Sequence, residues 1–225
     1  MPDRLLFADA PSAADVLTFA SRASRLSEDA VRLQASGGVL AMTAAPLAPR
    51  GLGDATPTVL AMRALAVDPE LVCDLVVAAS ELSIAADDAQ AVQLPDVGLA
   101  PPWAGIAPPR SGWTERTGIE ASTLAERAQA GIAAVAEKVP TDAGEDVVRA
   151  VRAAVWAVPD PALGELPQGT AFAAFALGFI NGAETARVLT SGPWTRVSLR
   201  RGHVLVRGPV ASGLTPVRRT GPAVA

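Results

Sequence analysis

Residues 30–44, AVRLQASGGVLAMTA, are the stretch that decides the fold. If the Gly-Gly pair at positions 37 and 38 forms a two-residue turn, Ala35 faces Leu40 and Leu33 faces Met42 across two antiparallel strands. One face of the hairpin is then apolar, while Arg32, Gln34, Ser36 and Thr43 share the other. The stretch therefore predicts an antiparallel sheet with one face against a core.

The segments on either side of this hairpin extend the sheet. A capping box at Ser12 and Asp15 predicts the start of a helix, which continues with Val16, Phe19 and Ala20 at helical spacing. Residues 58–67 and 71–77 read as a third and a fourth strand, and residues 79–88 as a short helix. We therefore predict an α+β domain over residues 1–92. Its order of one helix followed by three strands resembles the repeat of sliding clamps, without a shared motif.

Residues 93–118 differ in composition from the rest of the chain. Two Pro-Pro pairs alternate with Trp103 and Trp113, and prolines favour a stiff extended backbone. We predict a connector that packs on the body of the protein, because exposed tryptophans are costly in water. Recognition of a partner by the proline pairs is the alternative. Trp103 and Trp113 are also the candidate lining of a cleft between domains.

Residues 119–225 are predicted to form a helical domain. Apolar residues recur at helical spacing over residues 120–139 and 143–158, and residues 170–180 are apolar on all sides. A basic hairpin and a frayed Pro/Gly tail are expected to follow. Three helices before a hairpin have the outline of a winged-helix domain, in which the hairpin would lie on phosphates.

The basic hairpin covers residues 194–208, WTRVSLRRGHVLVRG. We predict a turn at Arg201-Gly202, which places Val197, Leu199, Val204 and Val206 on one face and the arginines and His203 on the other. The candidate anion or nucleic-acid contacts are Arg196, Arg200, Arg201, His203 and Arg207. The third predicted helix, however, has no Arg, Lys, Asn or Gln between residues 170 and 180 to contact a base edge.

Charge is distributed unevenly along the chain. Residues 185–225 hold seven arginines and no acidic residue, whereas residues 1–184 hold 12 Lys or Arg and 23 Asp or Glu. The basic end indicates either an anionic partner or attraction between the two parts of the chain.

The sequence lacks the residues that metal binding, disulfide formation and nucleophilic catalysis need. The single Cys73 and single His203 stand 130 positions apart, so neither a metal site nor a disulfide is predicted. A Ser–His nucleophile lacks a nearby carboxylate in the sequence, and we expect His203 to be an exposed hairpin histidine.

These observations predict a non-enzymatic interaction or scaffold protein of the cytoplasm, without a cofactor and without a membrane span. Its partner is expected to be a protein, including a second copy of the chain. The alternatives are an accessory protein that binds the nucleic-acid backbone through the basic hairpin, and a small-molecule binder that uses the cleft between domains.

Overall fold

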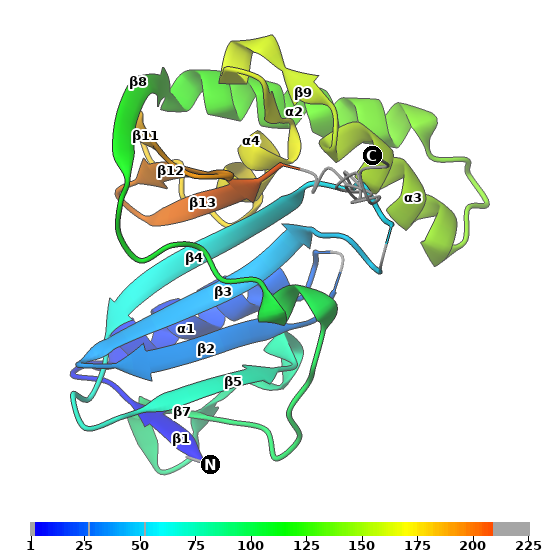
Figure 1. The fold of residues 1–225 in the computed structure, drawn as a ribbon. Coiled ribbons are helices and arrows are strands. Elements are labelled where there is room, and N and C mark those ends of the chain that lie inside the picture. The colour runs from blue at the N-terminus through cyan, green and yellow to red at the C-terminus, as the bar shows by residue number, and fades with distance from the viewer. Residues whose placement is uncertain (1–2, 27, 52, 209–225) are drawn as a thin grey trace, which may run out of the picture.

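A computed structural model describes residues 3–26, 28–51 and 53–208. Most of its strands form one antiparallel sheet in the order β5-β2-β3-β4-β13-β12-β11-β8 (Figure 1). These eight strands are β2 (Val31–Ser36), β3 (Val39–Leu47), β4 (Thr58–Ala66), β5 (Cys73–Val77), β8 (Thr114–Glu120), β11 (Thr185–Ser191), β12 (Trp194–Leu199) and β13 (Gly202–Arg207). The small sheets are β1-β7-β6, with β1 (Arg4–Leu6), β6 (Ser83–Ala85) and β7 (Asp88–Gln93), and β10-β9, with β9 (Pro159–Asp160) and β10 (Leu166–Pro167).

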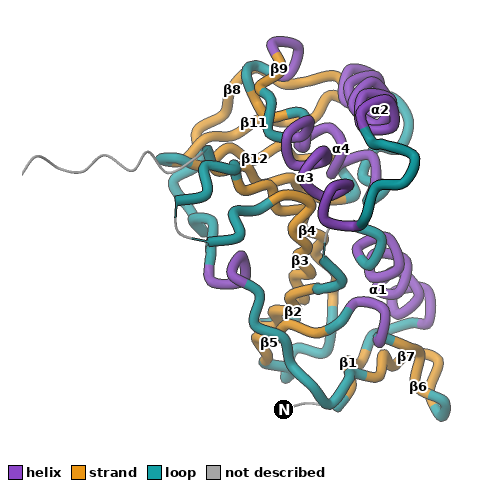
Figure 2. Tube along the Cα trace, turned by 90° about the vertical axis from the view of Figure 1, so that its right-hand side faces the viewer, coloured by secondary structure: helices purple, strands orange, loops and turns teal. Residues whose placement is uncertain are grey.

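Helices cover one face of the large sheet. The α-helices of the described residues are α1 (Ala10–Ala23), α2 (Ala121–Lys138), α3 (Glu145–Trp156) and α4 (Gly169–Ala176). The 3-10 helices are η1 (Ala79–Glu81), η2 (Pro102–Gly105) and η3 (Pro161–Leu163). The strands lie between the helices on one side and the loop that carries η2 on the other (Figure 2). The predicted α+β class is therefore confirmed. We call the helix-covered face the inner face and the opposite face the outer face.

The first hairpin has the predicted register. Ala35 pairs with Leu40 and Leu33 with Met42, and all four side chains are buried. Gly37 and Gly38 have φ values of 57° and 78°. This left-handed pair is what a two-residue hairpin turn needs, so local turn chemistry and burial select the same register.

The second hairpin has the predicted faces but a different turn. Leu199 pairs with Gly202 and Val197 with Val204, so the turn is Arg200-Arg201 and not Arg201-Gly202. The glycine has another role, because a Cβ on Gly202 would lie 2.5 Å from Cε1 of Phe179. Gly202 is thus required by a close aromatic neighbour and not by a turn, and the sequence alone does not show that neighbour.

The winged-helix outline is wrong. The hairpin β12–β13 does not project from the domain, because β13 pairs with β4 and β12 pairs with β11. The additional strands β8 and β11 complete the sheet on that side. The pairing of β4 with β13 joins the first half of the chain to the second in one sheet.

Two helix predictions also need correction. The capping box at Ser12 and Asp15 is absent: α1 begins one turn earlier, and Asp9 caps it by accepting a 2.7 Å hydrogen bond from the Ser12 N–H. Pro11 is tolerated there because the first turn has no need of its N–H. Residues 79–88 form η1, β6 and a turn instead of a helix, because β7 completes a sheet between β1 and β6.

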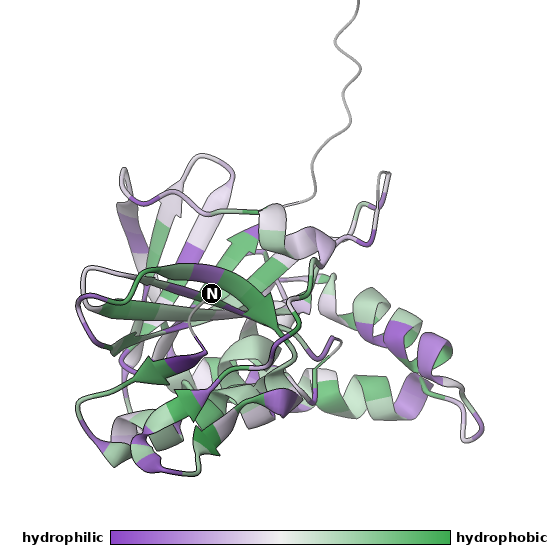
Figure 3. Ribbon diagram, turned by 90° about the horizontal axis from the view of Figure 1, so that it is seen from below, coloured by the Kyte–Doolittle hydropathy of each residue, from purple (hydrophilic) through white to green (hydrophobic). Residues whose placement is uncertain are grey.

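Two apolar clusters occupy the two faces of the large sheet. The larger one fills the inner face and includes Phe19, Leu33, Leu124 and Phe179. The smaller one lies on the outer face, where Trp103 and Trp194 pack with Leu60 and Leu205. The connector thus covers the outer face, while α2 and α3 extend past the end of the sheet with mixed polar and apolar surfaces (Figure 3). The predicted frayed tail lies outside the described residues.

Candidate functional site

A pocket lies where the two halves of the chain meet, beside the end of β3. Its walls are Trp103 of the connector, Trp156 of α3 and Phe172 of α4, and Arg50, Arg149 and Arg152 also line it. We call it the junction pocket. Its cavity volume is about 90 Å³, well below the roughly 300 Å³ at the lower end of pockets for drug-sized ligands. The junction pocket therefore accommodates a group of side-chain size.

The pocket wall on α3 is built by aromatic stacking. Trp156 stacks on Phe172 with ring centroids 4.3 Å apart. The six-membered ring of the indole contacts α2, where a Cβ on Gly131 would lie 2.4 Å from Cζ3 of Trp156. Gly131 is therefore needed for this ring to lie flat between the helices.

The indole N–H of Trp156 has no hydrogen-bond partner among the described residues, although the side chain is only 3% exposed. Nε1 lies on the side of the ring away from Gly131, because Cζ3 and Nε1 are on opposite edges of an indole. A buried donor without an acceptor costs about 1–3 kcal/mol. An incoming acceptor would recover that free energy.

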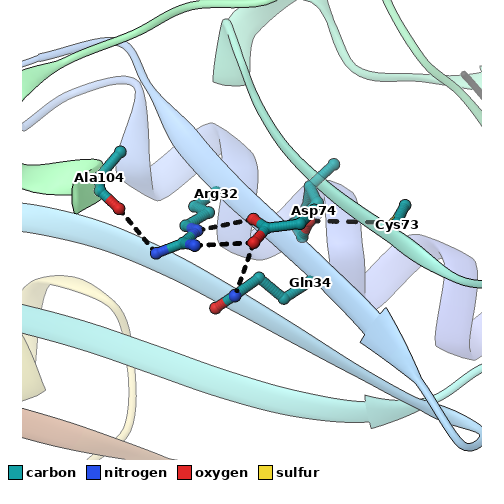
Figure 4. Close-up of polar contacts among 6 residues, drawn as sticks. Arg32, Gln34, Cys73, Asp74 and Ala104 are labelled. Atoms are coloured by element: carbon teal, nitrogen blue, oxygen red, sulfur yellow. Dashed lines mark hydrogen bonds and ion pairs between the residues drawn. The ribbon is translucent and has the colours of Figure 1, made fainter. Parts of the chain in front are cut away.

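The wall on the connector is held in place by polar contacts. Trp103 Nε1 donates a 2.8 Å hydrogen bond to Glu28 Oε2, and the ring is 2% exposed. Arg32 donates a 2.7 Å hydrogen bond to the Ala104 carbonyl. Two further nitrogens of Arg32 donate hydrogen bonds of 2.8 Å each to the Asp74 carboxylate (Figure 4). The Arg32 guanidinium lowers the pKa of the Asp74 carboxyl, so this pair stays charged. Strands β2 and β5 thereby fix the connector that carries Trp103.

Charged side chains of both signs line the pocket, namely Arg50, Arg149 and Arg152 with Glu28 and Asp54. Arg149, Arg152, Ala153 and Trp156 are spaced along one face of α3 and line the pocket together. Arg149 forms ion pairs with Glu145 and Asp146. Arg152 is half-buried and forms no ion pair with any described residue. The pKa of the Asp54 carboxyl is lowered by a hydrogen bond from the Thr56 side chain and by the backbone N–H groups of Arg50 and Thr56.

The two tryptophans proposed for a cleft lie in different places. Trp103 lines the junction pocket, whereas Trp113 lies on the outer face with the Arg196 guanidinium 4.7 Å from its ring centroid. Both belong to the outer-face cluster. Sequence reasoning missed Trp156, Phe172 and Arg152. Trp156 lies near the C-terminal end of the helix predicted over residues 143–158, and a large aromatic residue at that position was the sequence feature that could have indicated the pocket.

The candidate anion contacts of the second hairpin lie in two places, at its turn and on the outer face of the sheet. Arg200 and Arg201 lie at the exposed turn, where Arg200 contacts Glu184 and the Arg201 carbonyl accepts a hydrogen bond from Arg63. Arg196 and His203 lie on the outer face, and Arg207 pairs with Trp194 across the hairpin. His203 is half-buried and not exposed, because Met62 of β4 and Ser198 of β12 flank it.

The described residues contain no group of three or more His, Cys, Asp or Glu that could hold a metal ion. His203 Nδ1 lies 3.0 Å from Ser198 Oγ, but no carboxylate of the described chain is hydrogen-bonded to the imidazole. A Ser–His nucleophile needs such a third group to orient its base. Across the same residues, none of the helices combines the length and the apolar composition needed to cross a bilayer.

The solved structures that match this chain include DNA polymerase sliding clamps. A clamp from Bartonella birtlesii, DNA polymerase III subunit beta bound to griselimycin, matches with a TM-score of 0.50 at 12% identity, over 93% of this chain and 66% of the clamp. Pol III beta of Caulobacter crescentus matches with a TM-score of 0.47 at 12% identity, over 98% of this chain and 69% of the other. The likeness to the Bartonella clamp concerns the fold alone, and it agrees with the resemblance seen in the order of helix and strands.

Two family models match the sequence. Residues 1–105 match "Domain of unknown function (DUF8010)", and residues 108–211 match "Domain of unknown function (DUF8185)". The two matches meet within the connector. None of the curated proteins matches the chain.

Proposed function

We propose that this chain is a non-enzymatic interaction protein that holds a segment of a partner protein in the junction pocket. The observation that carries this proposal is the pocket itself, whose 90 Å³ cavity and aromatic walls suit one apolar side chain. Aromatic and arginine side chains around a desolvated pocket are the usual composition of energetic centres in protein interfaces.

The polar groups of the pocket suit a peptide. The buried Trp156 N–H lacks an acceptor, and a backbone carbonyl of a bound segment is such an acceptor. Arg152 at the edge would pair with a carboxylate next to the apolar side chain. We therefore expect a segment with an apolar residue beside an acidic one.

A filled pocket tests this function. Ala153→Leu places extra atoms in the pocket, and Ala154→Leu places the same atoms one residue away on the exposed side of α3. Peptides selected from a random displayed library on the wild-type chain should bind Ala153→Leu at least tenfold more weakly and Ala154→Leu unchanged. Equal binding to both variants, or no enriched peptide at all, would refute the proposal.

Nucleic-acid binding is the second candidate. Arg200 and Arg201 are exposed at the β12–β13 turn, and the Bartonella protein of like fold is a subunit of DNA polymerase III. Sequence-neutral phosphate contacts would make binding of labelled DNA steeply dependent on salt. Anisotropy should then show binding at low salt that Arg200→Ala/Arg201→Ala loses, and wild-type chain that binds no DNA at low salt excludes this candidate.

Self-association remains a prediction as well. Strand β8 is an exposed edge of the large sheet, and unpaired edges can accept a second chain. Analytical ultracentrifugation over a concentration series measures it directly.

A further inference from the structure

Three polar side chains stand in one row across the outer face of the sheet. Arg187 of β11 pairs with Ser198 of β12, and Ser198 pairs with His203 of β13. Residues opposite each other in antiparallel strands share a face and lie about 5 Å apart. Their neighbours Val188, Val197 and Val204 are buried in the inner core, so the row faces outward.

A fourth polar side chain stands beside this row. Arg196 of β12 lies over the ring of Trp113, with its guanidinium carbon 4.7 Å from the centroid. Its Nε is buried and has no hydrogen-bond partner, and Arg196 forms no ion pair with the described residues. The guanidinium is therefore partly removed from water without a compensating anion, which is costly.

Nearby charges do not supply that anion. Glu115 of β8 already forms an ion pair with Arg187. Its two carboxylate oxygens lie 2.8 Å from Nε and 3.3 Å from Nη2 of Arg187, and both side chains are largely exposed. Met62 of β4 and Trp113 of the connector are the neutral neighbours of the row. Positive charge thus prevails at this place on the outer face.

We propose that Arg196, Ser198 and His203 form a binding site for an oxyanion of the phosphate type, with the Arg187–Glu115 ion pair at its rim. Arginines bind phosphate oxygens through paired N–H groups, and a hydroxyl and an imidazolium donate further hydrogen bonds. Ser198 and His203 are already hydrogen-bonded at 3.0 Å. When the imidazole is protonated, Nδ1–H donates to Ser198 Oγ, which leaves the Ser198 hydroxyl proton and Nε2–H for the anion.

The electrostatics of these side chains agree with this assignment. The pKa of the His203 imidazole is lowered by burial and by Arg196. The pKa of the Arg196 guanidinium is lowered by burial and by Arg187. A bound anion would relieve both effects and therefore raise the pKa of His203.

His203 is the only histidine of the chain, so its imidazole NMR signals report on this site without assignment ambiguity. The test titrates the tag-free protein with pH in inorganic phosphate and in chloride at equal ionic strength. We expect phosphate to raise the His203 pKa and to shift its signals saturably. An unchanged pKa with no saturable shift would overturn the proposal.

Matched variants locate the response. Arg196→Gln should weaken the phosphate response at least tenfold, while Arg201→Gln, at the exposed turn of the same hairpin, should keep it. Ser198→Ala provides a second variant in case Arg196→Gln does not fold, as judged by circular dichroism. Loss of the response in Arg201→Gln, or its retention in both Arg196→Gln and Ser198→Ala, would contradict the assignment.

The same titration identifies the source of the phosphate. Inorganic phosphate, a mononucleotide and a short single-stranded oligonucleotide are compared at equal phosphate concentration. Tighter binding of the oligonucleotide supports the site with a nucleic-acid backbone as its source, and equal binding of all three supports it with a free or terminal phosphate. Failure of all three to respond overturns it. The site is separate from the junction pocket, so Ala153→Leu should leave every response unchanged.

Discussion

Single glycine residues determine how closely neighbouring layers of this protein pack against each other. Gly202 lets the Phe179 ring rest on β13, and Gly131 lets the Trp156 ring rest on α2. Neither glycine has a left-handed φ, so both are required by space and not by backbone conformation. A packed core leaves no room for even one added methyl group at such contacts.

Gly202→Ala should lower the free energy of unfolding by about 1–3 kcal/mol, because the new Cβ collides with a fully buried ring. Urea denaturation followed by circular dichroism measures this change. Gly51→Ala serves as the control, because its added Cβ meets no atom within 4 Å and its φ is not left-handed. Equal stability of the two variants would show that Phe179 does not constrain Gly202.

The free energy of unfolding should decrease as the pH is lowered, because His203 then becomes protonated. Its pKa in the folded chain is lowered from its ordinary value of 6.5. Between the folded and the ordinary value the unfolded chain therefore binds more protons, so stability is full above about pH 6.5 and declines as pH falls toward the folded value. Urea unfolding in chloride across this range should show the decline in the wild type and not in His203→Gln. A matching decline in both would assign it to other groups.

At the scale of elements, the connector behaves as a layer of the fold. Trp103 and the Arg32 bond to Ala104 fix it to the outer face of the sheet. The grip of Arg32 on Asp74 uses two nitrogens of a planar guanidinium, which a lysine cannot reproduce. This contact positions the connector wall of the junction pocket.

Arg32→Lys should therefore lower the free energy of unfolding by about 1–2 kcal/mol and speed amide hydrogen exchange over residues 98–105. Arg4→Lys is the matched control, because Arg4 and Asp87 form an exposed pair whose loss costs at most about 0.5 kcal/mol. Unchanged exchange in the connector of Arg32→Lys would mean that Trp103 alone holds it.

At the scale of the whole molecule, one sheet runs through both halves of the chain. The β4–β13 pairing joins residues 58–62 to residues 203–207, and β3 and β4 share their inner face with α4. Because the two halves share this sheet and its core, we expect them to unfold as one unit. We therefore expect that the boundary between the two family matches does not separate independent folding units.

Phe179→Ala should destabilise both halves together by about 3–5 kcal/mol. Phe179 lies beyond the connector, stacked against Phe19 of α1 with centroids 6.4 Å apart. Native-state hydrogen exchange should accelerate in β2 and β3 as much as in β12, and calorimetry should show one transition. Acceleration confined to residues after 108 would show that the halves unfold separately.

The sequence by itself determined the first hairpin, the helices α1, α2 and α3 to within a few residues, and the inward faces of both hairpins. These features follow from local turn chemistry and from the periodicity of apolar residues, which short stretches carry in full. The register of the second hairpin, the role of Gly202 and the place of Trp113 depend on residues far away in the chain. Only the tertiary structure decided them, because no local pattern records which ring or guanidinium a side chain meets. The same holds for the junction pocket, whose walls Trp103, Trp156 and Phe172 come from three separate elements.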